Sequence, residues 1–228
     1  MTEPRALVLP GALVTGPAAA RDFVMSSGAP SDAGCYRLVT CGRPPGGTCR
    51  SPPRRWPVDL DQHPGVSHLP DFDPVSDAVS AQGDTALNRA TDQINGVDAG
   101  VRLYRRPDNA VAPIRPPIRS RATFALIGQA PGVDASSNGM APIPLLPAGR
   151  ITDATILTSS DIPLTETGSA VLEELIQSPG PVCDTENPAC RRLPVFTQSA
   201  RGGVILAGQD AIALRLRNSP FTQAKTDP

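Results

Sequence analysis

The sequence of 228 residues is poor in aromatic side chains. They make up 4% of the chain, with one Trp, two Tyr and five Phe. A core without many large rings has to be filled by Val, Ile, Leu and Ala. Such a core suits packed sheets, or subunits that share apolar surface between copies.

The chain is also nearly neutral and lacks long apolar runs. Its 21 basic and 22 acidic residues give a net charge of -1, so no global field attracts nucleic acid or an anionic membrane. The apolar runs are a few residues long, far below the roughly 20 that span a bilayer. At the N-terminus, Glu3, Pro4 and Arg5 precede a short apolar stretch broken by Pro10 and Gly11. We therefore expect neither a transmembrane segment nor a secretory signal, and a protein kept in a cytosol until it is used.

Several enzyme signatures are missing. There is no G-x-x-x-x-G-K-[ST] phosphate loop, no G-x-S-x-G and no dinucleotide fingerprint, which removes kinase, α/β-hydrolase and Rossmann interpretations. Carboxylate pairs such as Glu173-Glu174 and Asp71-Asp73 stand without the aromatic platforms typical of carbohydrate sites. The sequence thus predicts no cofactor and no enzymatic activity.

The cysteine count is odd, so five thiols cannot all pair within one chain. Their spacing lacks the close C-x-x-C pairs of a zinc ribbon or a redox site. Cys183 and Cys190 can close a small surface loop as a disulfide. Two reduced loop thiols are the alternative in a cytosolic setting.

Proline and glycine are abundant, with 27 and 20 residues, and they interrupt the first half of the chain every few positions. We expect residues 1–96 to form an extended arm. Residues 42–57 combine five prolines and four arginines around Trp56, which predicts a polyproline-like or looped segment whose tryptophan contacts a partner. A solvated linker is the plainer interpretation, and nucleic-acid stacking a weaker one.

One helix is expected in the arm, at residues 73–96. Asp73 can cap it, Pro74 suits its first turn and Gly96 ends it. Its weakly apolar face needs a partner surface, either the rest of the chain or another copy. The partner-facing candidates are Val75, Val79 and Ile94.

From about residue 97 the pattern changes to short apolar alternations separated by turns, which predicts strands. Ser169 to Gln177 fits one or two helical turns. We expect a mainly β domain over residues 97–228, an antiparallel sandwich or jelly roll. The expected strands are residues 101–105, 122–127, 151–158, 195–197, 203–207 and 211–217.

The two histidines lie close together, in a segment rich in carboxylates. His63, His68 and Asp61 are the candidates for a divalent metal or for a hydrolase site. Pro64-Gly65 turns the chain between the histidines, and their spacing is not that of H-E-x-x-H. A polar loop is the interpretation favoured by this pattern.

The stretch Arg201-Gly-Gly-Val-Ile-Leu-Ala-Gly-Gln-Asp-Ala-Ile-Ala-Leu-Arg-Leu-Arg217 resembles the closing strands of β-sandwich domains in bacteriophage virion proteins. This resemblance implies a tail, neck, decoration or fibre component of a virion, made in the host cytoplasm. It also implies a homo-oligomer, a trimer or higher, that contacts other virion proteins but neither nucleic acid nor membrane. The alternatives are a secreted or surface ligand-binding module and a hydrolase that uses His63 and His68.

Overall fold

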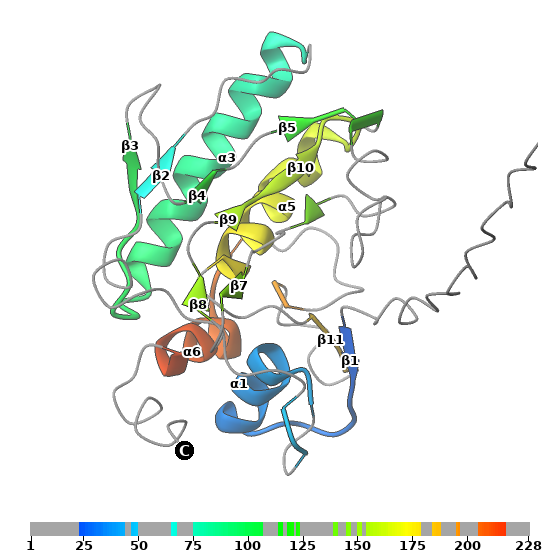
Figure 1. Cartoon of the computed structure of the whole chain (residues 1–228), viewed down its shortest axis with the longest axis vertical. Coiled ribbons are helices and arrows are strands. Elements are labelled where there is room, and N and C mark those ends of the chain that lie inside the picture. The colour runs from blue at the N-terminus through cyan, green and yellow to red at the C-terminus, as the bar shows by residue number, and fades with distance from the viewer. Residues whose placement is uncertain are drawn as a thin grey trace, which may run out of the picture.

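The computed structural model of the chain describes the parts that hold its helices, strands and core (Figure 1). These are residues 23–43, 47–49, 65–67, 75–106, 114–115, 118–120, 122–123, 139–140, 145–146, 150–151, 154–178, 184–187, 195–196 and 205–217.

The expected antiparallel β-sandwich is wrong, because helices dominate the described residues. The helices are α1 (Asp32–Cys41), α3 (Asp77–Gly96), α5 (Leu164–Gln177) and α6 (Gly208–Arg217). They are 10 to 20 residues long, whereas every described strand has two or three residues. The fold is α/β.

The main sheet is parallel and has the strand order β3-β2-β4-β9. Its strands are β2 (Gly65–Ser67), β3 (Tyr104–Arg106), β4 (Ile114–Arg115) and β9 (Ala154–Thr155). Helix α3 connects the adjacent parallel strands β2 and β3, as a parallel pair requires. The expected boundary near residue 97 therefore falls between a helix and a strand of the same layered unit.

A second sheet continues the first. It pairs β10 (Leu157–Ser159) with β5 (Ile118–Arg119) in parallel and with β6 (Gly139–Met140) in antiparallel orientation. Ile114 pairs with Ala154 and Ile118 with Thr158, so the two parallel pairs have the same offset. The two pairs therefore share one register. A further antiparallel pair joins β7 (Leu145–Leu146) to β8 (Arg150–Ile151).

Apolar side chains of the strands lie between the sheet and the helices. Val66, Ile114 and Ala154 are fully buried, as expected for parallel strands covered by helices, and so is Ile156 between β9 and β10. They join side chains from α3, α5 and α6 in one core that also contains Phe196. The expected aliphatic character of the core is confirmed.

The helix expected at residues 73–96 is present, with a later start. The Ser76 side chain caps it by accepting a hydrogen bond from the Val79 N–H, at 3.3 Å. Its buried face includes Ala86, Ala90 and Ile94, and it packs against α5 (Figure 1). The surface that α3 needs is supplied by its own chain.

Gly83 lets α3 approach the sheet closely. A Cβ atom at this position would collide with Cδ1 of Ile118 on β5 and would lie 3.3 Å from its Cγ1. Ile118 is buried, so its side chain has little room to turn away. The glycine costs helix propensity but preserves the contact between helix and strand.

We predict that Gly83→Ala lowers the unfolding free energy. Overpacking costs about 1–3 kcal/mol, which outweighs the gain of about 1 kcal/mol in helix propensity. In an Ile118→Val background, which lacks Cδ1, the same substitution should be neutral or stabilising. Urea denaturation measures both. Gly96→Ala is the matched control, because a Cβ there meets nothing within 4 Å; equal effects at the two glycines would contradict the steric account.

The expected strand at residues 211–217 is wrong, because Gly208–Arg217 forms α6. The alternation of Ile212, Leu214 and Leu216 suggested a strand, but the buried side chains follow a helical spacing: Asp210, Ala211, Ala213, Leu214 and Arg217. Ala, Leu and Arg are good helix formers. Asp210 in the first turn and two arginines in the last also complement the helix dipole.

The other elements predicted from the sequence agree only in part with the structure. The stretch predicted as one strand at 151–158 contains the short strands β8, β9 and β10, which belong to three different sheets, and the helical turns at 169–177 belong to the longer α5. Of the strand predicted at 101–105, only residues 104–105 form a strand, as part of β3. Residues 122–123 are helical, and neither 195–196 nor 205–207 is a strand; the rest of those predicted strands lies outside the described residues.

A smaller unit packs beside α6. Strand β1 (Phe23–Met25) pairs in parallel with β11 (Asp184–Glu186), and α1 packs against α6 (Figure 1). Ser31 caps α1, which ends at Gly42 in the left-handed conformation, with φ of 63°. Directly before this cap, Cys41 forms a disulfide with Cys49.

Candidate functional site

Helix α5 combines an apolar face with a polar one. Its apolar residues Val171, Leu172, Leu175 and Ile176 are buried in the core. Glu173 and Gln177 are half-buried and stand four residues apart, which places them on the same side of the helix. This pair forms the centre of the candidate site.

Glu174 is buried beside the pair. It lies under β6, where a Cβ on Gly139 would come within 2.7 Å of Glu174 Oε1 and 2.8 Å of its Cγ. Position 139 therefore requires glycine, and the backbone of β6 passes directly over the carboxylate. A carboxylate in such a place is held firmly by its surroundings.

A polar contact joins α5 to β11. Gln177 Nε2 donates to Asp184 Oδ1 at 3.2 Å, and Asp184 is buried. The next residue, Thr185, donates from its backbone N–H and its hydroxyl to the Phe196 carbonyl, at 2.7 and 3.1 Å. These bonds fix the position of the chain at residues 195–196 relative to the candidate site.

The same segment is bound from α6. The backbone N–H of Val195 donates to Asp210 Oδ2 at 3.0 Å. Hydrogen bonds therefore run from α5 through β11 and residues 195–196 to α6. Burial of Asp210 raises the pKa of its carboxyl group from 3.8 to about 6, partly offset by the hydrogen bond from Val195.

This raised pKa predicts a pH-dependent stability. The folded state holds the Asp210 proton more tightly than the unfolded state, so the contribution of Asp210 is greatest below pH 3.8 and falls as the pH rises to about 6. Asp210→Asn keeps an acceptor for the Val195 N–H and has no charge to bury. We expect the variant to be more stable above pH 6 by about 1–3 kcal/mol. Urea unfolding across this pH range measures the difference, and parallel profiles of the two proteins would contradict it.

The residue spacing of α5 can be compared with that of a zinc-binding helix. In zinc hydrolases with H-E-x-x-H on a helix, two His on one face bind the metal and the Glu acts as a general base. Here Glu173-Glu174-Leu-Ile-Gln177 has a Glu at the general-base position, whereas Glu and Gln stand at the His positions. In the sequence, Gly180 and Cys183 follow at the spacing of the longer motif H-E-x-x-H-x-x-G-x-x-H.

This arrangement cannot form the usual zinc site. The chain has only two histidines, His63 and His68, and neither is in α5. Among the described residues, no group of three or more His, Cys, Asp or Glu side chains is placed to hold a metal ion. The side chains at the two His positions are one carboxylate and one neutral amide, which is a poor zinc ligand.

A shallow hollow lies between the C-terminal end of α3 and the start of α6. Its lining is mainly apolar and includes the exposed Ile205. The polar groups at its edge have structural partners: Gln93 accepts from the Leu206 N–H at 2.7 Å, and Arg215 donates to the Val97 carbonyl at 2.8 Å. This hollow carries no catalytic group.

The structure describes few of the site residues predicted from sequence. Val75 and Val79 are half-buried, and Ile94 is completely enclosed in the core of its own chain. Cys35 is buried, and the disulfide of the described residues is Cys41–Cys49. The remaining candidates lie outside the described residues: Trp56, Asp61, His63, His68, Cys183 and Cys190.

No family model matches the chain, and no curated protein matches it either. Within the described residues, no helix has the length and apolar character needed to cross a membrane.

Proposed function

We propose that this protein is an exported binding domain in which α5 has the position of a zinc helix but does not support hydrolysis. The observation that carries the proposal is the half-buried pair Glu173 and Gln177, one helical turn apart beside the buried Glu174. Its spacing is that of H-E-x-x-H, without the imidazoles.

The chemistry of the site favours binding over catalysis. In zinc hydrolases the metal lowers the pKa of a bound water, and the neighbouring Glu takes its proton. Without a full set of metal ligands, Glu174 has no activated water to deprotonate. Its side chain is also confined beneath β6. At this site, Gln177 has a structural role, because it donates a hydrogen bond to Asp184 and so joins α5 to β11.

The zinc-helix interpretation makes a gain-of-function prediction. The double variant Glu173→His, Gln177→His restores H-E-x-x-H on α5, with Cys183 at the position of the third ligand. It should bind Zn²⁺ at least roughly tenfold more tightly than the unmodified chain, because two imidazoles on one helix face and a thiolate at the motif spacing make three zinc ligands. Competition with a chromophoric chelator measures the affinity.

The matched control places the same two residues elsewhere. Asn88→His, Asp92→His puts two imidazoles four residues apart on the exposed face of α3. If this control binds Zn²⁺ as tightly as the α5 variant, the α5 site has no special geometry and the proposal fails. Peptide hydrolysis by the unmodified chain in the presence of Zn²⁺ would equally contradict it.

The Cys41–Cys49 disulfide supports the exported location. Disulfides form and persist in oxidising compartments and are rare in the cytosol. This one closes a loop of eight residues at the end of α1, where Arg37 also donates to the Gly47 carbonyl at 2.6 Å.

With this disulfide, the N-terminal residues allow a different interpretation from the cytosolic one. Arg5 precedes the apolar residues 6–14, and Ala18-Ala19-Ala20 has the small-residue pattern of a cleavage site. Basic, apolar and small-residue regions follow one another in this order in secretory signals. Pro10 and Gly11, which suggested the absence of a signal, then lie within its apolar region.

We predict that protein recovered from an oxidising compartment contains the Cys41–Cys49 bridge. The Cys41→Ser, Cys49→Ser variant should lose about 2.5 kcal/mol of unfolding free energy, the entropy expected for a loop of this length. Non-reducing peptide mass spectrometry identifies the bridge, and the same data report the first residue of the mature chain and the state of Cys183 and Cys190. Free thiols at both Cys41 and Cys49 would contradict the exported location.

The virion role remains a prediction, but its sequence support has weakened. It rested on residues 201–217 forming two closing strands of a sandwich, and Gly208–Arg217 is helix α6. Of the earlier alternatives, the secreted binding module is the one that the disulfide favours.

A further inference from the structure

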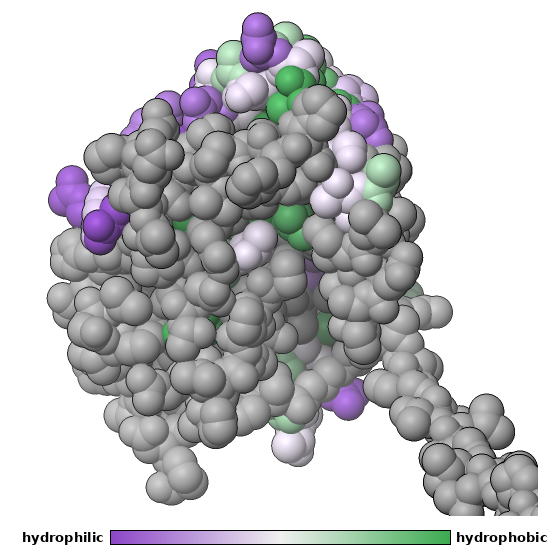
Figure 2. Space-filling view, turned by 45° about the horizontal axis from the view of Figure 1, so that its top comes forward, coloured by the Kyte–Doolittle hydropathy of each residue, from purple (hydrophilic) through white to green (hydrophobic). Residues whose placement is uncertain are grey.

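Residues 101–106 present different chemistry on their two sides. Val101 and Leu103 are buried, with 4% and 1% of their surface exposed. Arg102, Tyr104 and Arg106 alternate with them and are exposed. Figure 2 shows hydrophilic residues in purple on the left side of the molecule, where β3 lies in Figure 1.

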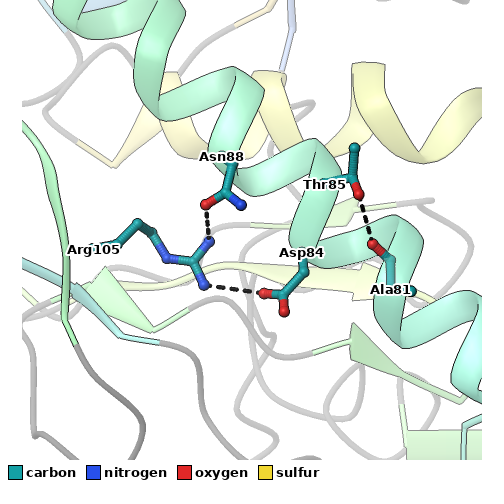
Figure 3. A network of polar contacts seen from close by, with 5 residues as sticks. All are labelled: Ala81, Asp84, Thr85, Asn88 and Arg105. Atoms are coloured by element: carbon teal, nitrogen blue, oxygen red, sulfur yellow. Dashed lines mark hydrogen bonds and ion pairs between the residues drawn. The ribbon is translucent and has the colours of Figure 1, made fainter.

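Arg105, the third arginine of this segment, lies on the opposite side and contacts α3. Arg105 points toward α3, where its Nη2 lies 3.0 Å from Asp84 Oδ1 and its Nη1 donates to Asn88 Oδ1 at 2.9 Å (Figure 3). Asn95 binds the preceding residues to the same helix, because its side chain bonds both the N–H and the C=O of Leu103, at 2.8 Å each. The backbone of this segment is therefore held rigidly by α3.

The exposed side forms a preorganised basic and aromatic surface. The guanidinium carbon of Arg106 lies 5.3 Å from the centre of the Tyr104 ring, and Arg106 Nη2 donates to the Tyr104 hydroxyl at 2.9 Å. Such contacts restrict an arginine that would otherwise sample many rotamers. Residues 99–106 contain three arginines and no acidic residue. Asp84 of α3 pairs with Arg105, whereas Arg102 and Arg106 form no ion pair among the described residues.

The backbone of β3 is also placed for pairing. Among the described strands, β3 is the last in the order β3-β2-β4-β9 and pairs only with β2. An edge strand presents backbone N–H and C=O groups that an extended peptide can use to add a strand.

We propose that the β3 edge binds an extended, acidic segment of a partner polypeptide, which adds as a strand to the main sheet. Backbone hydrogen bonds to β3 provide the affinity, and Arg102 and Arg106 select acidic side chains on the exposed side. Charge complementarity identifies the occupant: Arg102 and Arg106 are exposed on the same side, four residues apart, and fit carboxylates four residues apart on one side of an added strand. This surface is independent of the α5 site.

The test uses the full chain and a fluorescent peptide of alternating Thr and Glu, read by fluorescence anisotropy. Arg102→Glu, Arg106→Glu should weaken binding by roughly tenfold or more, because it places like charges opposite each other. The matched control Arg43→Glu, Arg89→Glu makes the same change in net charge at two other exposed arginines and should leave most of the affinity. An equal loss in both variants would show long-range attraction alone and overturn the proposal.

A second probe tests the backbone pairing. The same peptide with N-methyl groups on alternate residues keeps its charges but loses the donors that face β3 in a strand addition. Binding should fall by roughly tenfold or more. Undiminished binding of the methylated peptide, or no binding of the peptide without methyl groups, would contradict the proposal.

Discussion

The close packing of α3 on the parallel sheet is the constraint on which the rest of the structure depends. The described strands are two or three residues long, so each contributes few backbone hydrogen bonds. What holds them in register is the burial of Val66, Ile114 and Ala154 against the helices. Gly83 permits this approach, because a side chain there would displace Ile118.

This packing determines where the candidate site lies. Helix α5 follows β10 and packs beside α3. Its apolar residues are therefore buried in the core, and Glu173 and Gln177 lie half-buried at the edge of this core. From there, hydrogen bonds through Asp184, Thr185 and Asp210 connect α5 to α6. Burial of the charged Asp210 carboxylate costs stability, while its hydrogen bond from the Val195 N–H keeps residues 195–196 in position.

The elements that the sequence predicted correctly are those with a long helical period or a strong strand composition. Helix α3 has both a cap and a continuous face, and residues 151–158 are rich in β-branched side chains. Helix α6 was missed because Ile212, Leu214 and Leu216 also fit a period of two, and only tertiary contacts show which period is used. The parallel sheet was missed because its strands are too short to show the continuous apolar runs typical of buried strands. At α5, Glu173 and Gln177 have the spacing of a zinc-binding histidine pair, but without histidine this spacing carries no signal in the sequence.

The charges along β3 serve two physical purposes that need not compete. Arginines on an edge strand discourage another copy of the same chain from pairing there, because like charges would face each other across the new ladder. The same repulsion disappears when the incoming strand carries carboxylates, and it becomes attraction. Protection against self-association alone would be satisfied by mobile side chains, whereas Arg106 is stacked on Tyr104 and the backbone beneath is fixed by Asn95. Because these groups are ordered before a partner arrives, less entropy is lost on binding. This property favours recognition of a partner over simple protection against self-association.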